Sequence, residues 1–260
     1  MIKILKYSFF DLMRSRWVFI YAAFYMLFTV SLLWLSPDLS KVIISLMNLI
    51  LVLVPLVATM FSVMYYYNSR EFVELLLAQP IERSNIFLGQ YFGIAGSLAL
   101  SLLIGLGIPF IVYGIFQSTE IFNFLILLIV GIFLSFIFSA IAFLIALKNE
   151  NKIKGFGFAI LVWLFFAIVY DGLFLLLLVY FNDYPLENFA LVVSMLNPID
   201  LSRILILLKL DISALMGYTG AVFQKFLGSS LGVFAAVGVL ILWVGLPSFW
   251  IKKVVGKKDF

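Results

Sequence analysis

Six long stretches of this sequence are almost free of charged residues, and each is long enough to cross a lipid bilayer as a helix. A helix of about 20 apolar residues spans the hydrocarbon core, which is about 30 Å thick. The stretches predict spans at residues 17–35, 42–67, 88–116, 121–147, 155–181 and 226–251. Their continuous apolar character, without strict alternation, is typical of helices rather than of barrel strands. We therefore expect residues 1–260 to form one all-α integral membrane domain.

The overall composition agrees with this fold and removes several classes of function. The chain is 65% hydrophobic and 12% charged, which leaves too little polar surface for a soluble protein of 260 residues. It contains no Cys and no His, which excludes disulfides and the usual thiolate and imidazole metal sites. It also lacks the phosphate-binding pattern GxxxxGK(S/T). The sequence therefore predicts no catalytic residue, no metal site and no cofactor bound by this chain.

The basic residues indicate the orientation of the chain. Of the 17 Lys and Arg residues, all but Lys41, Arg203, Lys209 and Lys225 fall on one side of the six predicted spans. Because Lys and Arg concentrate in cytoplasmic segments, both termini are predicted to be cytoplasmic, in a bacterial inner membrane. Residues 182–225 are then periplasmic. The net charge of +4 follows from this orientation and does not indicate nucleic acid binding.

Two further patterns concern contacts with lipid and between helices. In residues 1–16, apolar residues alternate with five charged ones. This favours an amphipathic elbow helix in the layer of lipid head groups, with a simple basic flank as the alternative. Gly89, Gly93 and Gly96 follow a spacing of small residues that favours close packing between helices.

The segment between the second and third spans, residues 68–86, is short and strongly patterned. Ser69 is a candidate N-cap, and Glu71 lies where the helix dipole favours a carboxylate. Phe72 and Leu75 lie on one apolar stripe, and Pro80 ends the run. The pattern predicts a short helix at the cytoplasmic surface. Such a helix suits docking into a groove of a soluble partner, and it suits equally a plain connection between two spans.

Asp171 is the one charged residue clearly inside a predicted span. A charge near the centre of a bilayer costs at least about 2.5 kcal/mol, so this carboxyl should face protein or a wet cavity. Two interpretations stay open: the carboxyl either lines a pathway or gate, or it is hydrogen-bonded to a neighbouring helix or to the backbone.

The periplasmic segment 182–225 contains two apolar stretches, 189–196 and 204–208, that are too short to span a membrane. Asn197 and Pro198 separate them, and Asp200 is a candidate N-cap for a helix that begins at Leu201. Arg203 lies on the polar side of that helix. The pattern predicts a hinged helical cap, which would act either as a docking surface for another protein or as a passive lid.

Three stretches of the sequence resemble those of a known family. The first contains Arg70, Glu71, Phe72, Glu74, Leu75, Gln79 and Pro80. The second contains Asn197, Pro198, Asp200 and Arg203, and the third, residues 215–223, contains Tyr218. With them the chain resembles, over essentially its whole length, the six-helix permeases of the type-2 ABC transporters. It is most similar to the NosY-type permeases of the nitrous-oxide reductase maturation system.

The resemblance implies a division of labour among several proteins. The loop helix would be a coupling helix that inserts Phe72 and Leu75 into a cleft of a cytoplasmic ABC ATPase, with Glu71 and Glu74 at the rim. Two permease copies would work with two ATPases, which bind the ATP and Mg²⁺. A periplasmic β-helical copper-handling protein would sit on the second and third stretches and carry the copper. Asp171 resembles a carboxylate of the family's fifth span.

Other functions fit the sequence without these partners. A plain exporter of a small molecule, lipid or ion would use the same fold. A gradient-driven carrier would use Asp171 as its proton or ion site and would need no ATPase. An intramembrane hydrolase ranks last, because the spans contain no pair of carboxylates.

Overall fold

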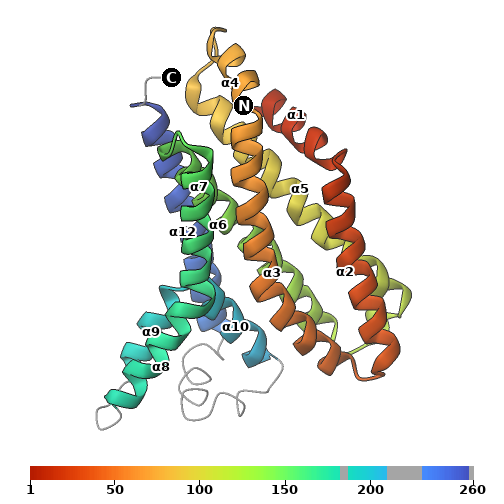
Figure 1. Cartoon of the computed structure of the whole chain (residues 1–260). Helices are drawn as coiled ribbons and strands as arrows, with labels where there is room; N and C mark the ends of the chain where they lie inside the picture. The colour runs from red at the N-terminus through yellow and green to blue at the C-terminus, as the bar shows by residue number, and fades with distance from the viewer. Residues whose placement is uncertain (182–186, 210–229, 258–260) are drawn as a thin grey trace.

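The computed structural model describes residues 1–181, 187–209 and 230–257, and these form helices joined by turns and loops (Figure 1). Within these residues, six helical segments are long and apolar enough to cross a membrane, which confirms the predicted all-α architecture. They are α2 (Arg16–Leu35), α3 (Leu39–Asn68), α5 (Arg83–Val112), α6 (Ile121–Lys148), the rod Lys152–Tyr180 and α12 (Ser230–Val255).

The two ends of the bundle carry different elements. Figure 1 shows the start of α1 (Ile2–Met13), the short helix α4 (Arg70–Leu77) and the end of α12 together at one end. The helices α9 (Glu187–Met195) and α10 (Pro198–Lys209) lie toward the other. We call the first the inner end, because most Lys and Arg residues lie there, and the second the outer end.

The centre of the bundle is formed by α3, α5 and α6; α6 packs extensively against both of the other helices, whereas α3 and α5 meet only over a short stretch. Ile50, Leu102 and Leu134, one from each helix, are completely buried. In contrast, the most apolar part of the rod Lys152–Tyr180 has no buried residue. In a bilayer such a surface contacts lipid or another protein.

The third span ends earlier than the sequence predicted. Helix α5 stops at Val112, whereas the predicted span ran to residue 116. Gly114 then adopts a φ of +90°, in the left-handed region that residues with a Cβ rarely enter. A short 3-10 turn, η1 (Ile115–Gln117), leads on toward α6. Gly114 therefore provides the stop that the apolar pattern did not reveal.

Helix α1 packs along the first half of α5, and glycines on α5 permit the close approach. A Cβ atom on Gly93 would lie 2.8 Å from the carbonyl oxygen of Leu5, and one on Gly89 would lie 3.0 Å from that of Met1. Gly105 gives α2 the same close approach further along α5. The close packing predicted from the glycine spacing is thus confirmed at Gly89 and Gly93, whereas a Cβ on Gly96 would make only an ordinary contact with Phe9, at 3.7 Å. A position of α1 among lipid head groups stays a prediction.

The fifth span is interrupted by a π-turn. It consists of α7 (Lys152–Leu164), the π-turn η2 (Phe165–Val169) and α8 (Tyr170–Tyr180). Such turns break the regular hydrogen-bond ladder of a helix and leave backbone groups available to other partners. After α8, α9 and α10 meet at an angle of 113°.

Candidate functional site

Helix α4 lies at the inner end, and its start is held by the core rather than by a capping side chain. Ser69 occupies the N-cap position of this helix, as the sequence predicted, but its hydroxyl forms no capping hydrogen bond. That hydroxyl donates to the carbonyl oxygen of Tyr66 at 3.3 Å and accepts from Nε2 of Gln90 at 3.2 Å. Gln90 is completely buried on α5. The junction of α3 and α4 is therefore tied to the third span.

The apolar side chains of α4 divide between the protein and the exterior. Val73 is buried, and the ring of Phe72 stacks on Tyr7 of α1 with centroids 4.8 Å apart. Leu75 is 69% exposed. Of the two anchors that the resemblance implies, Leu75 is thus available to a partner, whereas Phe72 is shared with α1.

Polar side chains surround Leu75. Glu71 is exposed in the first turn, and Glu74 accepts a hydrogen bond from Nε of Arg70 at 3.2 Å. We call the exposed set the α4 surface; it consists of Arg70, Glu71, Glu74, Leu75, Gln79 and Pro80. An apolar side chain within a polar rim is typical of a small docking surface for a protein.

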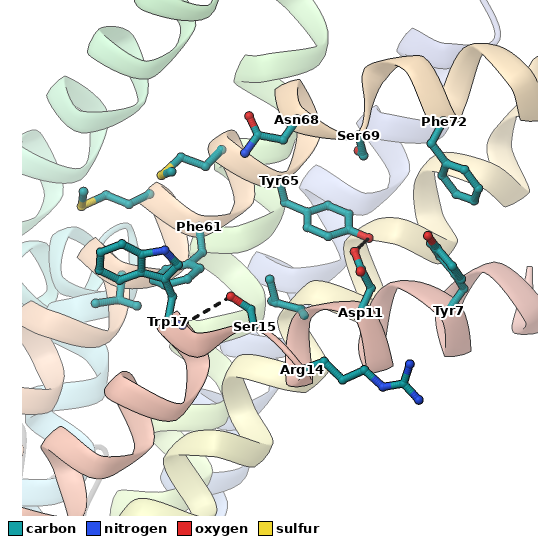
Figure 2. A pocket seen from close by; sticks show the side chains of 14 residues that line it. Tyr7, Asp11, Arg14, Ser15, Trp17, Phe61, Tyr65, Asn68, Ser69 and Phe72 are labelled. Carbon is teal, nitrogen blue, oxygen red and sulfur yellow. Dashed lines mark hydrogen bonds between the residues drawn. The ribbon is translucent and has the colours of Figure 1, made fainter.

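A cavity of about 900 Å³ adjoins α4 and lies between α1, the start of α2 and the last turns of α3 (Figure 2). We call it the α1–α3 cavity. The hydroxyl of Tyr65 donates to the carboxylate of Asp11 at 3.1 Å and so joins α3 to α1. Figure 2 shows Phe72 and Tyr7 toward one side of this contact and Trp17 toward the other.

At the outer end, three charged side chains form a cluster that links α10 to the fifth span. Nη1 of Arg203 donates to Asp171 of α8 at 2.8 Å and to Asp200 of its own helix at 3.1 Å. The side chains are 33%, 28% and 7% exposed, respectively. Asp171 is therefore hydrogen-bonded to an arginine of a neighbouring helix. This agrees with the interpretation in which the carboxyl is bonded to another helix.

Asn197 connects this cluster to the π-turn and starts α10. Its Nδ2 donates to a main-chain carbonyl of the π-turn and to Asp200, both at 2.9 Å. Its Oδ1 accepts from the amide of Ile199 at 3.0 Å, which is an N-cap bond. The prediction that Asp200 caps a helix beginning at Leu201 is wrong. Helix α10 begins at Pro198, because proline suits the first position after a cap.

Two aromatic side chains hold α9 against the spans. The hydroxyl of Tyr170 donates to the carbonyl oxygen of Val193 at 2.6 Å, and Nε1 of Trp243 donates to that of Met195 at 3.1 Å. Together with Asn197, these bonds fix the bend between α9 and α10. Trp243 belongs to no polar or spacing motif, so nothing in the sequence indicated its role.

The charges of the cluster do not balance, since two carboxyls share one guanidinium. Burial, followed by a hydrogen bond that protonated Asp200 donates to Asp171 and by the negative charge of Asp171, raises the pKa of Asp200 to about 8. Arg203 acts in the opposite direction without cancelling this shift. The raised pKa favours a proton on the cluster at a higher pH than an isolated carboxyl would hold one. In the described parts of the chain, no three His, Cys, Asp or Glu side chains lie close enough to hold a metal ion.

The predicted periplasmic docking residues differ in accessibility. Asn197, Pro198 and Asp200 are buried, and Arg203 is engaged in the cluster. Tyr218 lies outside the described residues. Their role in docking stays a prediction. In the described part of this segment, a docked protein would contact neighbouring exposed side chains such as Leu196.

Comparison with known proteins agrees with the resemblance found in the sequence, although no family model matches. The "Probable ABC transporter permease protein NosY" of Stutzerimonas stutzeri is 29% identical over 254 residues, which cover 91% of this chain and 90% of the relative. The protein of the same name from Pseudomonas aeruginosa is 26% identical over 254 residues and 90% of both chains. This protein, whose apolar helices are long enough to cross a membrane, is thus similar over nearly its whole length to proteins named as probable ABC transporter permeases of the NosY type.

Proposed function

We propose that the chain couples ATP hydrolysis by a cytoplasmic ABC ATPase to the periplasmic side of the membrane through α4. A permease of this class works with an ATPase partner, and this sequence has no phosphate-binding loop of its own. The observation that carries the proposal is the α4 surface, where Leu75 is exposed within a rim that includes Glu71 and Glu74.

The attachments of α4 support a role in transmitting movement. Ser69 and Gln90 join its start to α5, and the stacked rings of Phe72 and Tyr7 join it to α1. Val73 packs into the core. A displacement of Leu75 by a bound ATPase would therefore move several helices together instead of deforming a loose loop.

The proposed assembly contains two permease copies and two ATPases, which bind the ATP and Mg²⁺. Lipid and the second copy would share the exposed apolar surface of the rod Lys152–Tyr180. A periplasmic β-helical protein would carry copper and rest on the outer segment, so that the transporter supports maturation of the copper site of nitrous-oxide reductase. The bonds between α10 and α8 would pass movement of the spans to that protein.

Co-purification from detergent-solubilised membranes tests the coupling surface. The wild-type chain is compared with the double variant Glu71→Arg, Glu74→Arg. Glu150→Arg is the matched control, because Glu150 is also exposed at the inner end but does not belong to the α4 surface. We expect an ATPase with the wild type and the control, and its loss with the double variant. Equal recovery in all three would remove α4 from the coupling scheme.

The same preparations test the periplasmic part of the proposal. Recovery of a β-helical copper-binding protein together with the ATPase is the expected result. An ATPase without that protein would instead favour a plain exporter. If transport continued without any ATPase and stopped in Asp171→Asn, the chain would be a gradient-driven carrier.

A further inference from the structure

The α1–α3 cavity borders Tyr7, Ser69 and Phe72, which attach α4, but the rest of its lining belongs to no part of the coupling scheme. From one end of the cavity to the other this lining changes from apolar to charged, as a phospholipid does. Apolar side chains of α3, including Val57, Phe61 and Met64, line it within the span. Asp11 of α1 and Arg14, which directly follows α1, line it beside Tyr65 in the last turns of α3 (Figure 2). Hydrocarbon chains and head groups occupy these same two levels in a bilayer.

Two aromatic residues lie where the two parts of the lining meet. Trp17 is at the start of α2, and Tyr65 turns its hydroxyl toward Asp11 (Figure 2). Trp and Tyr favour this level of a membrane because their rings are apolar on one side and polar on the other. The volume of about 900 Å³ lies within the range of sites that hold small ligands.

The mouth of the cavity offers one charge of each sign. Asp11 and Arg14 are exposed and one helical turn apart. Neither forms an ion pair with another residue in the described parts of the chain. A guanidinium binds phosphate oxygens well, and a carboxylate accepts hydrogen bonds from a primary ammonium group.

We infer that the α1–α3 cavity binds a phospholipid of the inner leaflet, and that a head group of the phosphatidylethanolamine class fits it best. The phosphate contacts Arg14, the ammonium contacts Asp11, and an acyl chain follows α3. Phosphatidylcholine fits less well, because its quaternary ammonium has no hydrogen to donate to Asp11. Free phosphate would leave the apolar lining unused, and a second copy of this chain would have to desolvate both charges.

Lipid retention by the full-length chain tests this inference. The protein is placed in nanodiscs with equal amounts of phosphatidylethanolamine and phosphatidylcholine, transferred to mild detergent and analysed by native mass spectrometry. We expect about one retained phosphatidylethanolamine per chain, and about tenfold less in Arg14→Gln or Asp11→Asn. Arg16→Gln is the matched control, because Arg16 is exposed nearby but does not line the cavity. It should retain lipid like the wild type.

Two results would overturn the inference. The first is that the chain retains both lipids equally and that retention is the same in all three exposed variants, Arg14→Gln, Asp11→Asn and Arg16→Gln. Lipids bound anywhere on the surface would behave in this way. The second comes from Met64→Cys in this cysteine-free chain. Efficient disulfide cross-linking of two such chains in the membrane would show a second copy in the cavity, whereas uncross-linked chains support lipid as its occupant.

Discussion

The inner helix α4 and the outer helix α10 are both short and both carry charged residues, but they use those charges in opposite ways. In α4 the paired side chains Arg70 and Glu74 are 58% and 59% exposed. In α10 the paired side chains Arg203 and Asp200 are 33% and 7% exposed, and they also hold a carboxyl of another helix. Exposed pairs add little to stability, whereas breaking a buried pair is costly. Changes in α10 should therefore affect folding, and changes in α4 should affect binding of a partner.

The largest effect is expected from Arg203→Met. The change leaves Asp171 and Asp200 without their guanidinium, so the free energy of unfolding should fall by on the order of 3 kcal/mol. The matched change Arg70→Met should cost about 0.5 kcal/mol or less. Denaturant unfolding of the purified protein in detergent measures both. Equal losses would contradict the contrast between the two helices.

A smaller effect is expected from Asn197→Ala, which removes the cap of α10 and two further hydrogen bonds. The cost should be about 2 kcal/mol, and the first amides of α10 should exchange faster with solvent. Ser69→Ala should cost about 1 kcal/mol through the lost partner of Gln90, without faster exchange at the start of α4. Hydrogen exchange followed by mass spectrometry separates these outcomes. Fraying of α4 in Ser69→Ala would mean that Ser69 caps it after all.

The third prediction concerns pH. Because the pKa of Asp200 is raised from 3.8 to about 8, the folded chain holds a proton that the unfolded chain releases. This contribution to stability is complete below the ordinary carboxyl pKa and is lost as the pH rises through about 8. Unfolding midpoints measured across this range should fall less steeply with pH in Asp200→Asn. An unchanged slope would show that another group titrates.

The smallest effects on folding are expected within α4. Phe72→Ala loses the stacking on Tyr7 and should cost about 1 kcal/mol. Leu75→Ala should cost less than about 0.5 kcal/mol, since the side chain is mostly exposed. Yet Leu75→Ala should reduce co-purification of the ATPase more than its effect on folding would suggest. A large folding defect in Leu75→Ala would place this side chain inside the protein.

Much of the fold could be predicted from the sequence, because a chain that crosses a lipid bilayer can adopt few backbone structures. Backbone groups in hydrocarbon must be bonded internally, so each long apolar stretch becomes a helix. The helix α4 was also predictable from its own residues, including Glu71 in the first turn and Pro80 beyond the end. The stop at Gly114 was harder to foresee, since the apolar pattern continues past it.

The details that failed depend on contacts between distant residues. Asn197 and Asp200 are equally good capping types, and only the folded chain decides between them, by burying both beside the π-turn. Ser69 had the right position to cap α4, but a buried glutamine 21 residues later competes for its hydroxyl. The pair of Asp171 and Arg203 joins two helices whose paired residues are 32 positions apart in the sequence, and no local pattern specifies such a contact. Local sequence shows which side chains are able to form such bonds, but the packing of distant residues determines which bonds form.

The close packing at the glycines of α5 affects the order in which the helices come together during synthesis. Helices α1 and α2 pack on α5 through Gly89, Gly93 and Gly105, although α3 is made in between. The first span therefore enters the bilayer before its main partner exists. It has to wait there, exposed to lipid, until the ribosome has completed roughly the first two fifths of the protein.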